Sequence, residues 1–301
     1  MQKDTFWDAS NNSCNVGNSR ISRVVDLEHV PFSAELVFPD ANSEIIKQLS
    51  KKIGLQHFSD VTLDLLLSFH SFLIQTEKYN ILVDTCCGNE KDRPTRPAWH
   101  QRTGPFLDNL KHFGLTPSDI HFVLCTHLHA DHVGWNTKLL NGKWVPTFPN
   151  AQYLFTKKEF DYWKTENQKN PSEPIMYGSF NDSILPVIKS GQAVLVDSDH
   201  RIDTGIQLEP AYGHTPGNII VNVESKGDKA VLCGDVIHHP LQLLKPMWSS
   251  NFCYDPELSR KTRLNLLNRC AGAKIAILPA HFHSPDYGYI ERDGDAYQLV
   301  K

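Results

Sequence analysis

The chain has 301 residues, of which 40% are hydrophobic and 21% charged, so it can bury one large core or two of ordinary size. Its net charge of -4, with no lysine- or arginine-rich run, excludes the concentrated basic surface that nucleic-acid binding requires. The longest apolar stretch, residues 61–74, is interrupted by Asp64, Ser68, His70 and Ser71, so it is too short and too polar to cross a bilayer.

The N-terminal residues and the cysteines bear on location. The first twenty residues contain no apolar segment of the secretory type, and the seven cysteines include no CxxC pair. A chain of this length does not need disulfides to fold, so we expect reduced thiols and a cytoplasmic protein. Residues 1–20, rich in asparagine and serine, are expected to form a flexible arm, and residues 21–301 a single domain.

Strand patterns dominate the first part of the chain. Apolar alternation predicts strands over residues 22–30 and 61–85, the second broken by a turn at residues 77–80. Residues 104–115 place apolar side chains at helical spacing and end at a glycine, which predicts a helix. A short strand over residues 121–126 then leads into a histidine-rich stretch.

The second part repeats this order of elements. Residues 164–190 are polar and interrupted by prolines, and we expect them to be an insertion over the surface. Strands are expected at 151–156, 192–198, 205–213, 218–225, 229–236 and 274–282, helices at 156–163 and 255–272, and a closing hairpin at 288–300. The pattern indicates one α/β fold with two layers of sheet and helices outside.

The stretch THLHADHVGW, residues 126–135, is the strongest chemical signal. His127, His129, Asp131 and His132 form an HxHxDH motif. Imidazole nitrogen and carboxylate oxygen suit Zn²⁺, Mn²⁺ or Fe²⁺ better than a soft, thiolate-selecting metal. One tetrahedral ion cannot readily take all four side chains and keep a water for catalysis, so the motif indicates two ions.

Three further candidate ligands follow in the chain. His214 lies in GHTPG, Asp235 follows the apolar run AVLCG, and His281 follows IAILPA. A single histidine is more often structural or solvated than a ligand. Three candidates, each just beyond a strand-like run where the loops at one edge of a sheet could gather them, predict a metal centre.

This ordered set resembles the metallo-β-lactamase superfamily, from LVDT near residue 82 to PAHF near residue 282. The resemblance implies an αββα four-layer sandwich. It also implies two ions and a bridging hydroxide held by seven side chains: His127, His129 and His214 on the first ion, Asp131, His132 and His281 on the second, and Asp235 between them. Asp84, in LVDT, matches a carboxylate that braces the ligands in such folds.

Particular stretches narrow the resemblance. CCGNEKDRP and DHVGWNT are similar to the branch of N-acyl-homoserine lactonases and methyl-parathion-type organophosphate hydrolases. The main zinc class of β-lactamases has a cysteine where Asp235 stands and lacks the equivalent of His132. Lactonases often carry a tyrosine three residues after the bridging aspartate, whereas this chain has His238, as on the organophosphate-hydrolase side. Cys233 is interpreted as a core residue.

The expected function is a dinuclear metal-dependent hydrolase, most similar to lactonases and esterases, with quorum quenching by ring opening of acyl-homoserine lactones as the example. Asp235 and His238 are the expected catalytic residues. His238 would donate a hydrogen bond to the oxyanion or protonate the leaving alkoxide, and a packing role beside His239 is the equal alternative. Phosphotriester hydrolysis is the alternative activity. A mono-iron oxidoreductase and a non-catalytic sensor of the same fold are further alternatives.

The expected cofactors are two divalent ions per chain, with Zn²⁺ first and Mn²⁺, Co²⁺ or Fe²⁺ as alternatives. The expected partner is a small ester or lactone, with no nucleic acid and no membrane, and the family likeness favours a homodimer. Residues 87–102, 164–190 and 241–248 are the expected walls of the substrate pocket.

Overall fold

The chain folds into two compact units. The computed structural model describes residues 6–169 and 172–301. Unit 1 contains the described residues up to Asn18, Glu28–Ser68 and Arg201–Lys301, and unit 2 contains Ser19–Leu27 and Phe69–His200. In neither described segment is any helix long and apolar enough to cross a membrane.

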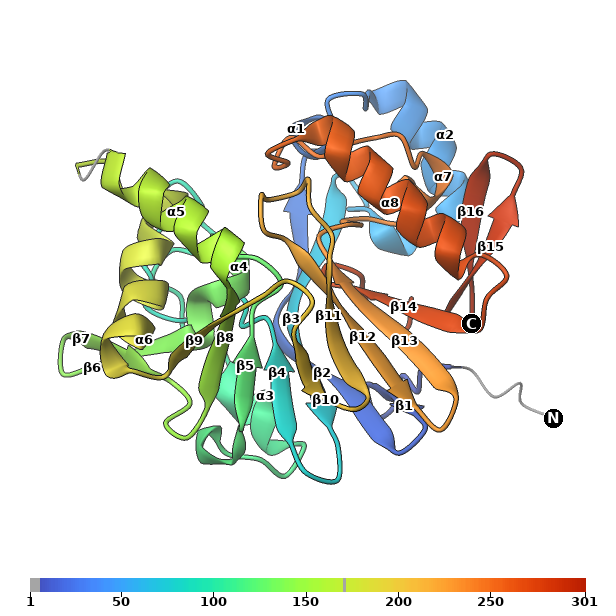
Figure 1. The fold of residues 1–301 in the computed structure, drawn as a ribbon. Helices are drawn as coiled ribbons and strands as arrows, with labels where there is room; N and C mark the ends of the chain where they lie inside the picture. The colour runs from blue at the N-terminus through green and yellow to red at the C-terminus, as the bar shows by residue number, and fades with distance from the viewer. Residues whose placement is uncertain (1–5, 170–171) are drawn as a thin grey trace. The chain divides into compact units, whose positions relative to one another are not determined.

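Unit 2 is built on a mostly parallel sheet (Figure 1). Its strands include β3 (Leu65–Gln75), β4 (Asn80–Val83), β5 (Phe122–Leu124), β8 (Gln152–Thr156) and β9 (Ala193–Val196). The first residues of β3, up to Ser68, belong to unit 1. β3 and β4 form the expected antiparallel pair, and β4, β5, β8 and β9 pair in parallel in that order. The central strands read as apolar runs because helices cover such sheets.

The helices of unit 2 follow these strands. The longer elements are α3 (Phe106–Lys111), α5 (Lys157–Lys169), the π-helix η5 (Phe180–Ile184) and α6 (Leu185–Ser190). Shorter helices are η2 (Pro117–Asp119), α4 (Ala130–Val133), η3 (Gly134–Asn136) and η4 (Met176–Gly178). Unit 2 also contains the hairpin β6 (Thr137–Leu140)–β7 (Lys143–Pro146). Figure 1 shows α5 alongside β8.

Unit 1 contains a five-stranded sheet. Its order is β10 (Arg201–Asp203), β11 (Ile206–Pro210), β12 (Ile219–Ser225), β13 (Asp228–Gly234) and β14 (Ile275–Pro279). Neighbouring strands are antiparallel except β13 and β14, which are parallel. The crossover between those two includes α8 (Pro256–Cys270), where the Asp255 side chain accepts a hydrogen bond from the Leu258 N–H, as expected of an N-cap.

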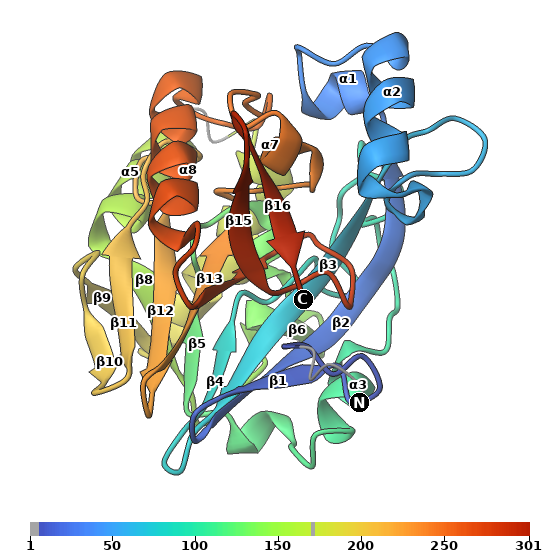
Figure 2. The ribbon, with the colours of Figure 1, turned by 90° about the vertical axis from the view of Figure 1, so that its right-hand side faces the viewer.

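The rest of unit 1 includes part of β2 (Ser19–Phe32), whose first nine residues belong to unit 2. Its other elements are β1 (Ser13–Val16), α1 (Ala34–Val37), α2 (Ser43–Ile53), η1 (Leu55–His57), α7 (Leu241–Leu244) and the closing hairpin β15 (Tyr289–Asp293)–β16 (Ala296–Val300). Figure 2 shows the hairpin beside α7. The predicted α/β class and the hairpin are confirmed.

Two stretches differ from expectation. Residues 1–5 lie outside the described residues. In the rest of the expected arm, Trp7 is 2% exposed, its ring centroid lies 4.6 Å from that of Tyr287 in a tilted arrangement, and its indole N–H donates a hydrogen bond to Ser284. In the expected surface insertion, the described residues after 178 are helical, and Phe180, Ile184 and Val187 are buried. A few apolar side chains therefore anchor stretches that look polar overall.

Lys91 is a fully buried cation in unit 2. Its Nζ donates to Thr137 Oγ1 at 2.7 Å and lies 3.5 Å from Asp182 Oδ1. Both carboxylate oxygens of Asp182 are already bound by the Arg93 guanidinium, at 2.7 and 2.9 Å. Burial therefore outweighs the Asp182 charge and lowers the pKa of Lys91 to about 7.

This shift predicts how stability depends on pH. Between about 7 and its ordinary pKa of 10.5, Lys91 binds a proton in the unfolded chain but not in the folded one. The free energy of unfolding should therefore rise with pH in that window, by up to about 1.4 kcal/mol per pH unit. We expect Lys91→Met to lose this rise, measured as the wild-type minus variant difference in urea unfolding at pH 7, 8 and 9. A difference that stays constant over the three values would contradict the shift.

Candidate metal centre

The HxHxDH motif lies on the loop that follows β5. His129 is the N-cap residue of α4, and Asp131 and His132 lie within that helix. His127 is fully buried, and its ring lies 4.5 Å from the ring of His129 and 4.0 Å from that of His132. The strand ends at Leu124, three residues before the first histidine, so the imidazoles converge through a turn and not through strand alternation.

Asp84 holds this loop from the end of the neighbouring strand. Because β4 and β5 are parallel, their carboxyl ends lie at the same edge of the sheet. The Asp84 carboxylate accepts the Thr126 N–H at 2.7 Å and lies 2.9 Å from Nδ1 of His132. Nδ1 of His132 therefore carries the proton, and Nε2 keeps the lone pair of a neutral ring. Asp84, the carboxylate expected to brace the proposed ligands, therefore contacts the histidine loop at two points.

Two further contacts, one at Gly134 and one at Glu159, fix the loop. A Cβ on Gly134 would lie 2.0 Å from the Cys87 carbonyl, so only glycine allows this approach. Glu159, 1% exposed on α5, accepts the Leu128 N–H at 3.1 Å and the Trp163 indole N–H at 2.6 Å. The sequence around Glu159 gives no sign that its carboxylate faces this loop from another element.

In unit 1, three histidines surround one carboxylate. Nε2 of His214 and Nε2 of His238 each lie 3.3 Å from Oδ2 of Asp235, and Nε2 of His281 lies 3.1 Å from Oδ1. All four side chains are at least 95% buried. Asp235 directly follows β13, and His281 lies two residues after β14. Because these strands are parallel, both residues lie at the same edge of the sheet.

Each of these rings has its own support. Nδ1 of His281 lies 2.9 Å from the Ser68 carbonyl oxygen, and Nδ1 of His214 lies 3.5 Å from Cys253 Sγ. A carbonyl can only accept, so Nδ1 of His281 donates and its Nε2 directs a lone pair at Asp235. The loop of His214 depends on Gly213, which has φ +126° and where a Cβ would lie 2.3 Å from the Ser259 nitrogen.

His238 is positioned through its backbone. Its N–H donates to Gln242 Oε1 at 2.7 Å, and Gln242 in turn donates to the Trp248 carbonyl at 2.9 Å. The buried Arg263 donates to the carbonyls of Val236 and Trp248, and burial lowers its pKa to about 10. Among the described residues, no group forms a hydrogen bond with Nδ1 of His238. The ring therefore keeps a nitrogen for another partner.

The chemistry of these groups fits divalent cations. In unit 1, the lone pair on Nε2 of His281 faces a carboxylate oxygen, so two acceptors meet unless a cation or a second proton lies between them. In unit 2, Nε2 of His132 lies 3.6 Å from Asp131 Oδ2, so a nitrogen lone pair again faces a carboxylate oxygen. Buried imidazole and carboxylate ligands, with oxygen acceptors behind the rings, are typical of zinc sites.

Other residues fall outside these two groups. Cys233 is fully buried and burial raises the pKa of its thiol well above the usual value, as expected of a core residue. His70 contacts Arg23, His121 accepts the Asn80 N–H, and His239 lies 3.1 Å from the His57 carbonyl. His283 contacts Glu28 at 2.8 Å.

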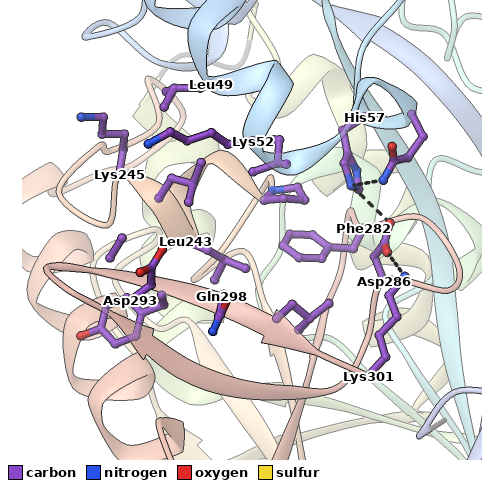
Figure 3. A pocket seen from close by; sticks show the side chains of 17 residues that line it. Leu49, Lys52, His57, Leu243, Lys245, Phe282, Asp286, Asp293, Gln298 and Lys301 are labelled. Atoms are coloured by element: carbon purple, nitrogen blue, oxygen red, sulfur yellow. Dashed lines mark hydrogen bonds and ion pairs between the residues drawn. The ribbon is translucent and has the colours of Figure 1, made fainter. Parts of the chain in front are cut away.

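Unit 1 also contains a cavity of about 820 Å³, shown in Figure 3. Phe282 lines it, whereas the preceding residue, His281, faces Asp235. Of the expected substrate walls, residues 243–245 contribute to the lining. His57 and Lys301 both contact Asp286 at one end, and burial lowers the pKa of His57 to about 4. The cavity therefore lies behind the histidine loops and contains none of the four clustered side chains.

Buried imidazoles and carboxylates that lie just beyond strand ends are the geometry expected of a metal-binding α/β protein. The family model of the metallo-beta-lactamase superfamily matches residues 68–293, about three quarters of the chain. The chain belongs to this superfamily. The predicted fold class and family are therefore confirmed.

Individual relatives are more distant. An N-acyl homoserine lactonase of Bacillus sp is 26% identical over 173 residues, which cover 54% of this chain and 60% of that protein. The chain thus matches less than two thirds of the length of the first curated relatives. The solved hydrolase AbOPH superposes with a TM-score of 0.79 at 24% identity, covering 100% of this chain and 98% of the other. The dizinc quorum-quenching lactonase AidC, solved with a product, gives 0.74 at 20% identity, covering 96% of each chain.

The brace from Glu159 gives a prediction for the histidine loop. Glu159→Ala would leave the buried Leu128 and Trp163 N–H groups without their acceptor. We expect the free energy of unfolding, measured in urea, to fall by about 1–3 kcal/mol. Asp161→Ala is the matched control, because Asp161 lies on the same helix in an exposed ion pair with Lys157 and should change stability by less than about 1 kcal/mol. Equal losses in the two variants would show that Glu159 does not brace the loop.

Proposed function

We propose that this protein is a metal-dependent hydrolase of ester bonds, with lactones as its preferred substrates. The observation that carries the proposal is the group of three buried histidines whose Nε2 atoms lie within 3.3 Å of the Asp235 carboxylate. The curated relatives named as lactonases support the lactone preference.

We propose that two divalent ions are bound by the seven expected ligands: His127, His129, Asp131, His132, His214, Asp235 and His281. Zn²⁺ suits these ligands best, with Mn²⁺, Co²⁺ and Fe²⁺ as alternatives. Bound in this way, the ions would supply a hydroxide nucleophile near neutral pH and would polarise the scissile carbonyl. The two-ion form, and not a single iron, is favoured because both halves of the ligand set pair imidazole with carboxylate.

We assign separate roles in this reaction to Asp84, Ser68, Asp235 and His238. Asp84 and the Ser68 carbonyl hold protons on the Nδ1 atoms of His132 and His281, which keeps the Nε2 lone pairs available. Asp235 supplies the negative charge between the ligands. His238, fixed through its backbone, would donate a hydrogen bond to the developing oxyanion or a proton to the leaving alkoxide.

Phosphotriester hydrolysis is the second candidate. It is favoured by His238 itself, which stands where lactonases often have a tyrosine. A hydroxide nucleophile can attack carbon or phosphorus, so the catalytic residues scarcely separate the two reactions. The walls of the substrate pocket would decide between them, and residues 87–102, 164–190 and 241–248 remain the proposed walls.

The remaining proposals concern the environment of the protein. We propose a cytoplasmic location, supported by the seven cysteines, all of which are free thiols in the described segments. We also propose a homodimer, on family likeness, with residues 21–301 forming one functional domain.

A substrate panel tests the activity. The Zn²⁺- and Mn²⁺-loaded protein is assayed on acyl-homoserine lactones, simple lactones, aryl esters and paraoxon-type triesters. We expect the highest kcat/KM on a lactone. Asp235→Asn should lower kcat/KM by at least about 10³-fold and reduce the metal content, because the carboxylate charge is lost. Triester turnover alone would favour the second candidate, and no turnover of any substrate by metal-loaded protein would overturn the proposal.

A second variant separates the possible roles of His238. If it donates to the oxyanion or leaving group, His238→Ala should lower kcat by about 10²–10³-fold while metal content stays at the wild-type value. Elemental analysis is run beside the kinetics. Loss of an ion would identify His238 as a ligand, and unchanged turnover would remove it from the chemistry.

A further inference from the structure

A second group of ligand-capable side chains lies in unit 1, formed by Glu28, His29 and His283. One ligand-capable atom from each lies within 4.8 Å of the other two. None of them belongs to the seven proposed ligands. His283 is 6% exposed, Glu28 is partly buried and His29 is exposed, so the group opens from a buried histidine to the surface.

The backbone at His29 brings these groups together. Successive side chains of a regular strand point to opposite faces. His29 has φ +54°, a left-handed conformation that is unfavourable for a residue with a Cβ and that interrupts the alternation of β2. As a result, the adjacent residues Glu28 and His29 both contact His283, the first through a 2.8 Å contact to Nδ1 and the second by ring stacking at 4.4 Å.

The surroundings of His283 resemble those of a metal-binding histidine. Its Nε2 lies 2.9 Å from the Leu66 carbonyl oxygen, which can only accept, so Nε2 carries a proton. Nδ1 of a neutral ring then directs its lone pair at the Glu28 carboxylate, which is also an acceptor. Only a positive charge between them, either a second proton or a metal ion, makes this contact favourable. A backbone carbonyl that accepts from one ring nitrogen orients the other nitrogen of a histidine toward a metal. Here the Glu28 carboxylate lies beside that second nitrogen, where it could be a further ligand.

We propose that Glu28, His29 and His283 bind an additional divalent transition-metal ion, with Zn²⁺ as the best match to two imidazoles and one carboxylate. Three protein ligands leave the remaining coordination position to water. The exposed His29 ring can turn its nitrogen from the stacked position toward the ion. The ion would join β2 to the loop after β14, which also carries His281. The proposal does not depend on the hydrolase activity.

Two substitutions test the site while preserving the backbone. His29→Asn removes the imidazole but keeps a residue that tolerates the left-handed conformation. Glu28→Gln removes the charge and lets an amide N–H donate to Nδ1 of His283, so the fold no longer needs a cation there. His112→Ala, another exposed histidine, is the control.

The experiment measures zinc bound per chain by elemental analysis across a series of buffered free-zinc concentrations. Both substitutions are also made in the Asp235→Asn background, so that this site is counted separately from the proposed hydrolytic ions. We expect each substitution to remove one equivalent of zinc or to raise its dissociation constant at least 10-fold in either background, with no change in His112→Ala. Zinc should also raise the Tm of Asp235→Asn, and His29→Asn should make that rise smaller.

Identical zinc binding by the wild type, His29→Asn and Glu28→Gln would overturn the proposal and identify the contact as a proton-mediated ion pair. Circular dichroism of each variant shows whether it is folded. If Asp235→Asn has no effect on zinc binding but His29→Asn does, the proposed hydrolytic centre fails and this site stands. The opposite result leaves the hydrolytic centre and removes this site.

Discussion

The state of the histidines depends on the oxygen atoms that lie behind their rings. A neutral imidazole offers one lone pair, and the group on the other nitrogen decides which atom carries it. The Asp84 carboxylate makes this choice for His132 in unit 2, and the Ser68 carbonyl makes it for His281 in unit 1. Both oxygens belong to the sheets, at the end of β4 and within β3, so the strands themselves fix how the rings point.

This arrangement links folding to the binding of cations. Burying a carboxylate and three imidazoles together removes them from water, which is unfavourable unless their charges and lone pairs are matched. Around Asp235, matching requires either protonated histidines or a positive ion. A ligand that binds only the folded chain adds its binding free energy to stability. A protein with such a cluster should therefore be stabilised by divalent metal. This stabilisation should decrease at low pH, because protons compete with the metal for the histidine nitrogens.

The sequence predicts the chain order of most strands well, because apolar runs are local signals, and it marks the histidine-bearing loops through HxHxDH, while the ligand set itself stays a prediction. It does not reveal contacts between distant residues. Glu159 supports Leu128 from another element, and nothing adjacent to Glu159 marks that role. Helix α2 received no prediction, although Asn42 caps it and Ile46 and Leu49 are buried. Residues 164–190 look polar because their composition hides three buried apolar side chains.

The position of His238 shows why ligand geometry alone gives limited information on substrate choice. Its backbone is bound to Gln242, and Gln242 and Arg263 both donate to the Trp248 carbonyl. The position of the ring is thus set by the loop and not by a partner at Nδ1. In the proposed donor role, His238 would stabilise negative charge on a carbonyl or on a phosphoryl oxygen, because both are acceptors of similar size. Selectivity between them must then come from side chains that contact the rest of the substrate.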